Sequence, residues 1–230
     1  MVDNPLQNVS FASNGSTAHG YLAVSESGQG PGVIVIQEWW GLVPHIADIT
    51  NRLAAEGFVA VAPDLYGGST THDAGEAARL TQELPVDRAA RDLSGAIDFL
   101  LRHEGVTGNA VGAVGFCMGG GFVLSLAAQQ GDRIGAAVPF YGMPSGETDF
   151  SGLTAPVLGN YGEQDQFVPA DKVREMFSTI GRQSGTQPEL HFYPAGHAFL
   201  NDENLLGTYD ADQGQIAWRR TVEFLNAHLG

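Results

Sequence analysis

Residues 110–121 read Ala-Val-Gly-Ala-Val-Gly-Phe-Cys-Met-Gly-Gly-Gly, an apolar run that leads straight into a glycine cluster. The run Ala110–Phe116 predicts a buried strand, and the segment Met118–Gln129 after it predicts a helix. Cys117 therefore stands at a tight strand-to-helix turn in the pattern Gly-x-Cys-x-Gly, which is typical of a nucleophile elbow. Glycines flank the cysteine because such a turn leaves no room for β-carbons. The alternative is a glycine-rich connection around an inert, packed cysteine.

On both sides of this turn, short apolar runs alternate with longer amphipathic ones. The other predicted strands are His19–Ser25, Val33–Gln37, Phe58–Ala62, Ile134–Phe140, Ala155–Tyr161 and Glu189–Tyr193. The other predicted helices are Ile46–Glu56, Ala74–Leu84, Val86–His103, Val173–Gly181 and Gln215–Leu229. This alternation predicts an α/β fold with an open, mostly parallel sheet and helices on both faces. No segment resembles a linker, so we expect a single domain over residues 1–230.

The charge balance restricts the partners that the chain can take. It has 26 acidic and 11 basic residues, a formal net charge of −15, which disfavours nucleic acid and anionic membranes as partners. With one cysteine, no disulfide can form within the chain. Residues 1–10 lack the features of a secretory signal, and no apolar run approaches the ~18 residues of a membrane span. We therefore expect a cytoplasmic protein, either a monomer or a small homo-oligomer.

Chemically active side chains follow the ends of the predicted strands. They are Glu38, Asp64, Cys117, Tyr141, Asp165 and His197. In an open α/β sheet, the groups beyond the carboxyl ends of the strands gather at one edge and form the ligand site. The sequence therefore predicts a site at this edge.

Three of these residues occur in the order nucleophile, acid, histidine that α/β-hydrolases use. Cys117 would attack as a thiolate favoured by the helix N-terminus, His197 would take its proton, and Asp165 would orient the imidazole. Glu163 is a rival for the acid, but Asp165 is favoured because the segment from Asp165 to Pro169 leads into the next helix. The alternative makes Asp165 a turn or cap residue and His197 an ordinary loop histidine.

Four motifs carry a resemblance to a known family. They are Gln-Glu-Trp-Trp-Gly at 37–41, Ala-Pro-Asp-Leu-Tyr-Gly at 62–67, Gly-Phe-Cys-Met-Gly-Gly at 115–120 and Gly-His-Ala-Phe at 196–199. In order and spacing, from roughly Gly20 to the C-terminus, the chain resembles the dienelactone hydrolases (carboxymethylenebutenolidases). The resemblance implies an α/β-hydrolase core of eight strands and hydrolysis of an enol-lactone ester through an acyl-thioenzyme. It implies no cofactor, and the sequence contains no obvious metal-ligand cluster.

The resemblance also assigns further site residues. Glu38 would hydrogen-bond the resting thiol and swing away when substrate binds; the alternative is an acid at a strand end paired with an arginine. The oxyanion hole would be the backbone N–H groups of Met118 and Trp39. From their positions after predicted strands, Trp40 and Tyr141 are expected to line the substrate pocket, together with Phe199. The alternative for the paired aromatics Trp39 and Trp40 is a place in the core.

The chain departs from the family where the substrate carboxylate is bound. Well-known members use two arginines, one of them four residues after the catalytic histidine, where this chain has Asn201. The other position falls near Arg79, in a segment that differs in sequence. Because a charge-assisted contact would be missing, we expect a neutral ester or lactone as the small-molecule substrate.

The same residues are compatible with other functions. A broad carboxylesterase or thioesterase would use the same residues, and a non-catalytic binding protein could retain the hydrolase scaffold. A glutamine amidotransferase is disfavoured because its acid usually lies two residues after the histidine, where this chain has Phe199.

Overall fold

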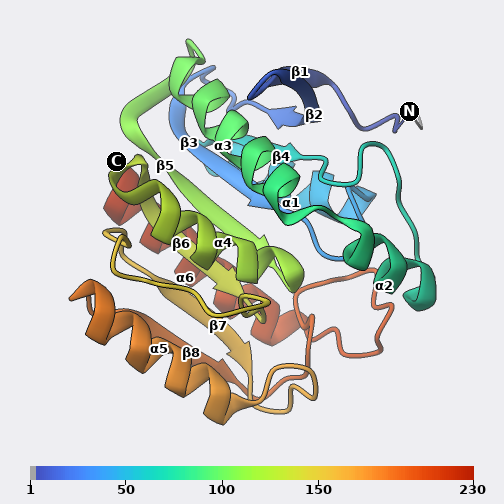
Figure 1. Ribbon diagram of the computed structural model, residues 1–230, viewed down its shortest axis with the longest axis vertical. Coiled ribbons are helices and arrows are strands. Elements are labelled where there is room, and N and C mark those ends of the chain that lie inside the picture. The colour runs from blue at the N-terminus through green and yellow to red at the C-terminus, as the bar shows by residue number, and fades with distance from the viewer. Residues whose placement is uncertain (1–3) are drawn as a thin grey trace. The chain divides into compact units, whose positions relative to one another are not determined.

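The computed structural model describes residues 4–230 and arranges eight strands in the order β1-β2-β4-β3-β5-β6-β7-β8 (Figure 1). The strands are β1 Val9–Ser13, β2 Ser16–Ala23, β3 Gly30–Ile36, β4 Val59–Pro63, β5 Val106–Phe116, β6 Ile134–Phe140, β7 Leu158–Gly162 and β8 Glu189–Tyr193. The helices are α1 Pro44–Ala55, α2 Ala74–Glu83, α3 Val86–Arg102, α4 Met118–Gln130, α5 Ala170–Ser184 and α6 Ala211–Leu229, with a 3₁₀ turn at Gly131–Arg133. The predicted α/β fold with a mostly parallel sheet is confirmed.

The chain divides into two compact units between Val111 and Gly112, a point inside β5. The expectation of a single domain over residues 1–230 stays a prediction.

The first unit holds β1 to β4, the first part of β5, and helices α1 to α3. Strands β1 and β2 are antiparallel, β2 is antiparallel to β4, and β3 is parallel to β4. Every residue of β4 is buried, which explains its continuous apolar sequence. Helix α1 starts with Pro44, whose ring suits the first helical turn, and Asp73 caps α2 by accepting a hydrogen bond from the Glu76 N–H at 2.8 Å.

The second unit holds the rest of β5 and the parallel strands β6, β7 and β8. Helix α4 passes in front of β6 in Figure 1, while α6 lies behind it, and both helices contact this strand. Helix α4 is apolar on nearly all sides, as expected of a helix that lies in the core. Helix α5 ends at Gly185, whose φ of +72° is readily adopted only by glycine.

The structure corrects several predicted boundaries. The hairpin partner β1 was not predicted, and β2 begins at Ser16 rather than His19. The signal for this β1–β2 hairpin was the pair Asn14-Gly15, which forms its two-residue turn with both residues at positive φ. Strand β5 begins at Val106, four residues before the predicted start, and β7 begins at Leu158, three residues after it.

Helices α5 and α6 also begin earlier than predicted. Helix α6 starts at Ala211 because Asp210 caps it, accepting from the Gln213 N–H at 3.0 Å. No helix within residues 4–230 is long and apolar enough to cross a membrane.

Two glycines inside helices give a matched test of the packing. A β-carbon on Gly95 of α3 would lie 2.3 Å from the Ala12 carbonyl oxygen of β1, whereas one on Gly181 of α5 would have no neighbour closer than 3.5 Å. We expect Gly95→Ala to lower the free energy of unfolding by about 1–3 kcal/mol, because α3 must move off β1. Gly181→Ala should raise it by up to about 1 kcal/mol through helix propensity. Urea denaturation measures both, and equal effects would contradict the close approach.

Candidate active site

The backbone at Cys117 has a conformation that few residues with a β-carbon adopt. Its φ is +53° and its ψ is −117°, between the end of β5 and the start of α4. Such a conformation costs on the order of 1–3 kcal/mol and persists only where the surroundings hold it. Here the Cys117 N–H donates to the Phe140 carbonyl at 3.0 Å, and the Cys117 carbonyl accepts from the Gly120 N–H at 3.0 Å.

The glycines around Cys117 are required by close backbone contacts. A β-carbon on Gly115 would lie 2.3 Å from the Gly119 carbonyl oxygen, and one on Gly121 would lie 2.2 Å from that of Met143. A β-carbon on Gly142, in the loop after β6, would lie 1.9 Å from the Cys117 carbonyl oxygen itself. The turn is therefore enclosed on several sides by backbone, as the elbow pattern in the sequence predicts.

The structure brings Asp165 and His197 together and leaves Glu163 apart from them. Nδ1 of His197 donates to Oδ2 of Asp165 at 2.7 Å, and both side chains are buried. The other carboxylate oxygen of Asp165 accepts from the backbone N–H groups of Phe167 at 2.8 Å and Val168 at 2.9 Å. Glu163 is exposed to solvent. The buried charge of Asp165 is thus matched by three hydrogen-bond donors.

The environment of His197 raises the pKa of its imidazole. Burial pushes the pKa of the imidazole down, but hydrogen bonds to Asp165 and Cys117, together with the negative charges of these two groups, raise the pKa to about 10. Because Nδ1 is bound to Asp165, the nitrogen that faces Cys117 is Nε2. The three residues thus form one hydrogen-bonded chain that can pass a proton from sulfur to nitrogen.

Two aromatic rings contact the imidazole of His197. The ring of Tyr141, which is fully buried, has its centroid 5.2 Å from that of the imidazole, and the ring of Phe167 has its centroid 5.0 Å away. Phe199 is also fully buried and packs on Tyr141 at 5.5 Å and on Tyr193 at 5.1 Å. Phe167 was not among the predicted site residues; its signal in the sequence is an aromatic residue two positions after the acid.

Asn201 lies in the loop after His197 and takes part in local structure. Its side chain is buried, and its Oδ1 accepts from the Glu203 N–H at 3.0 Å. The same loop is attached to the histidine by Thr208, whose hydroxyl donates to the His197 carbonyl. Asn201 thus stabilises a turn of this loop.

The first unit contains five of the predicted residues. Asp64 is buried after β4, and its carboxylate accepts from the backbone N–H groups of Tyr66 at 3.0 Å and Gly68 at 2.9 Å. Glu38 is buried beyond the end of β3, and Trp40 is buried with its ring 5.0 Å from that of Trp39. Arg79 lies exposed on α2, where its guanidinium pairs with Glu76 at 2.6 Å and also with Glu83.

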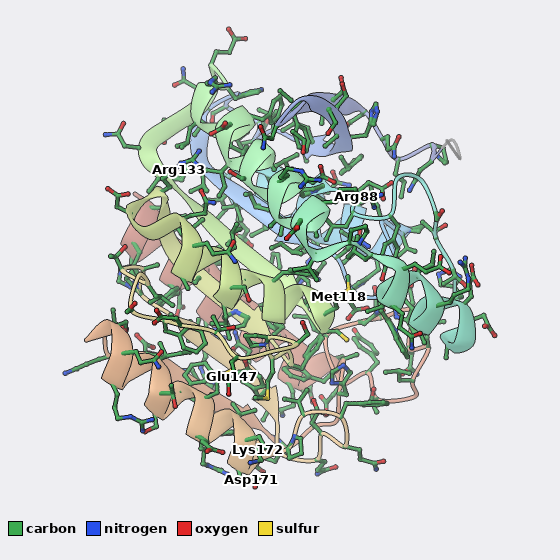
Figure 2. All side chains as sticks on the ribbon, viewed as in Figure 1. Arg88, Met118, Arg133, Glu147, Asp171 and Lys172 are labelled. Atoms are coloured by element: carbon green, nitrogen blue, oxygen red, sulfur yellow. The ribbon has the colours of Figure 1, made fainter. Side chains whose placement is uncertain are left out.

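Met118, in the second unit, is the first residue of α4, and Figure 2 labels it at that end of the helix. Its place after Cys117 is the one predicted for an oxyanion-hole N–H. Within residues 4–230, no group of three or more His, Cys, Asp or Glu side chains is placed to hold a metal ion.

The raised pKa of His197 predicts a pH dependence of stability. An unfolded histidine has a pKa near 6.5, so the contribution of the folded-state interactions is complete below that pH and is lost as the pH rises towards about 10. We expect the free energy of unfolding of the wild type to fall across this window more steeply than that of His197→Gln. Urea denaturation between pH 6.5 and 9.5 measures both slopes, and parallel curves would contradict the raised pKa.

Comparisons with known proteins identify the family of this chain. The family model of the dienelactone hydrolase family matches residues 18–229. A protein of Aquifex pyrophilus named "Protein usf" is 36% identical over 97% of this chain and 99% of its own length. An Aquifex aeolicus protein named "Putative carboxymethylenebutenolidase" is 32% identical over 97% and 99% of the two chains.

A solved structure from Klebsiella pneumoniae, described as "Putative Dienelactone Hydrolase", has a TM-score of 0.84 at 31% identity and covers 95% of this chain and 96% of its own. The α/β-hydrolase fold and the resemblance seen in the sequence are therefore confirmed. The chain belongs to the dienelactone hydrolase family and is an ester hydrolase of that type.

Proposed function

We propose that this chain hydrolyses a small ester or lactone, with Cys117 as nucleophile, His197 as general base and acid, and Asp165 as the carboxylate that orients the imidazole. The observation that carries this proposal is the hydrogen-bonded chain from Asp165 through His197 to Cys117. A buried carboxylate bonded to Nδ1 fixes the tautomer whose Nε2 can accept the thiol proton.

The reaction has two stages. In the first, the thiolate of Cys117, whose proton is held by Nε2 of His197, attacks the substrate carbonyl carbon. The tetrahedral intermediate collapses, the C–O bond breaks, and His197 returns the proton to the departing alkoxide, which leaves an acyl-thioenzyme. In the second stage, His197 removes a proton from water and the hydroxide attacks the thioester carbonyl carbon. The C–S bond then breaks, the carboxylic acid leaves, and the Cys117 thiolate is regenerated beside the protonated His197.

The negative charge of the tetrahedral intermediate needs donors that are already in place. The Met118 N–H stands at the N-terminus of α4, where helix N–H groups and the positive end of the helix dipole favour an anion. The second donor would be the Trp39 N–H, from its position in the sequence. Removal of one such donor typically costs on the order of 10²–10³ in kcat.

A neutral substrate fits this chain better than the carboxylate-bearing dienelactone. Asn201 supplies no positive charge, and it is buried in its own turn. The guanidinium of Arg79 is already paired with two glutamates of α2. A substrate carboxylate would therefore gain little from either position. A neutral compound also agrees with the net charge of −15, which repels anions.

A broad carboxylesterase or thioesterase activity is the second candidate. The hydrogen-bonded chain is equally suited to any activated acyl group, and Cys117 is partly accessible. A cytoplasmic location and a monomeric or small homo-oligomeric state stay predictions from the sequence.

The nucleophile is tested with Cys117→Ala on 4-nitrophenyl acetate, dienelactone and a neutral lactone. We expect the wild type to turn over the neutral lactone with a higher kcat/KM than dienelactone, and the variant to lose at least about 10³-fold on both. Steady-state kinetics gives both values. Turnover retained by folded Cys117→Ala would disprove the cysteine mechanism. A preference for dienelactone would show instead that another cation binds its carboxylate.

We further propose, from the sequence resemblance, that the buried carboxylate of Glu38 restrains the resting thiol. A carboxylate that accepts a hydrogen bond from a thiol disfavours the thiolate. Glu38→Gln should therefore react with iodoacetamide several-fold faster than the wild type at pH 7. Glu163→Gln, which removes an exposed carboxylate, serves as the control and should react at the wild-type rate. An unchanged rate for Glu38→Gln would refute this role.

A further inference from the structure

Phe167 is an unusual surface residue because its ring lies against a buried, functional side chain. Its exposed fraction is 65%, one of the two largest among the big apolar side chains of residues 4–230. The same ring has its centroid 5.0 Å from that of the His197 imidazole, at an interplanar angle of 55°. One part of the ring therefore covers the histidine while the rest faces solvent.

The position of Phe167 is set by the turn that also fixes the acid. Its backbone N–H donates to Oδ1 of Asp165 at 2.8 Å, and the next N–H, of Val168, donates to the same oxygen. Pro169 then leads directly into α5. These bonds fix the backbone at Phe167, and the contact between the two rings places its side chain beside the imidazole of His197.

The chemistry of His197 identifies the part of the substrate that comes near Phe167. In the first stage, His197 returns a proton to the oxygen of the departing alcohol, so that oxygen must lie within about 3 Å of Nε2. The group attached to the oxygen then extends over the surroundings of the imidazole. Tyr141 is fully buried, whereas Phe167 is exposed, so an incoming group can reach the ring of Phe167.

We propose that Phe167 determines specificity for the alcohol portion of the substrate, by packing against an apolar or aromatic group attached to the leaving oxygen. For a lactone, this group is the ring carbon next to the ring oxygen. The inference rests on the proposed function of His197 as the acid of the first stage. The ring adds an apolar contact in the acylation step and leaves the hydrolysis of the acyl-thioenzyme unaffected.

Two ester series separate the alcohol side from the acyl side. The first varies the alcohol at constant acyl group, with methyl, butyl and benzyl acetate, all of which form the same acetyl-enzyme. The second varies the acyl group at constant alcohol, with 4-nitrophenyl acetate, butyrate and octanoate. In Phe167→Ala, we expect the ratio of kcat/KM for benzyl acetate to that for methyl acetate to fall about three- to ten-fold, the loss of one aromatic contact. The ratio of octanoate to acetate in the second series should stay within two-fold of the wild type.

A binding measurement supports the kinetics. Benzyl alcohol, the product, should inhibit 4-nitrophenyl acetate hydrolysis by the wild type, and Phe167→Ala should raise its inhibition constant by a similar three- to ten-fold. Phe167→Leu keeps apolar bulk and should recover part of both effects. Val86→Ala, which truncates an equally exposed apolar residue at the start of α3, should behave as the wild type.

The outcomes are distinguishable. If kcat/KM of Phe167→Ala falls equally for all esters, Phe167 has a structural role only. If the fall in kcat/KM depends on the length of the acyl group, the ring contacts the acyl side. Either result overturns the inference. If Cys117→Ala keeps the wild-type activity, the proposed function fails first. If Cys117→Ala is inactive while Phe167→Ala matches the wild type in both series, the function stands and the role of Phe167 does not.

Discussion

The site depends on one backbone constraint, the turn at Cys117. The residue keeps a positive φ because its N–H and its carbonyl are both engaged, one with Phe140 and the other with Gly120. The carbonyl of Cys117 is also in close contact with the α-carbon of Gly142, where no side chain could fit. The conformational cost of this turn is therefore met by hydrogen bonds and packing in β5, α4 and the loop after β6.

The hydrogen bonds of the buried Asp165 carboxylate are the second requirement of the site. A carboxylate buried as deeply as Asp165 is stable only when its oxygens are fully hydrogen-bonded, and here two backbone N–H groups and one imidazole N–H supply the bonds. The two backbone bonds come from residues two and three positions after the acid, so the local turn helps to orient the carboxylate towards the histidine. The imidazole then takes a defined tautomer, and its second nitrogen is directed at the sulfur.

Much of this arrangement could be predicted from the sequence, because strong local patterns determine it. The elbow glycines, the order of Cys117, Asp165 and His197, and the limits of β6 and β8 follow from short motifs and apolar runs. Strand β1 was missed because only two of its five residues are buried, so its apolar pattern is weak. The contact between Phe167 and His197 joins residues 30 positions apart, and no periodicity in the sequence reports such a contact. The pairing of Arg79 with Glu76 and Glu83 was overlooked, although its helical spacing is visible in the sequence.

The surroundings of the imidazole also bear on its motion. Exposed aromatic and imidazole rings reorient on fast timescales, and a histidine that turned over would exchange the positions of its two nitrogens. In this chain, the bond from Nδ1 to Asp165 and the adjoining rings of Tyr141 and Phe167 oppose such a rotation. The imidazole is therefore held in one orientation, with Nδ1 towards Asp165, by contacts that are in place without any ligand.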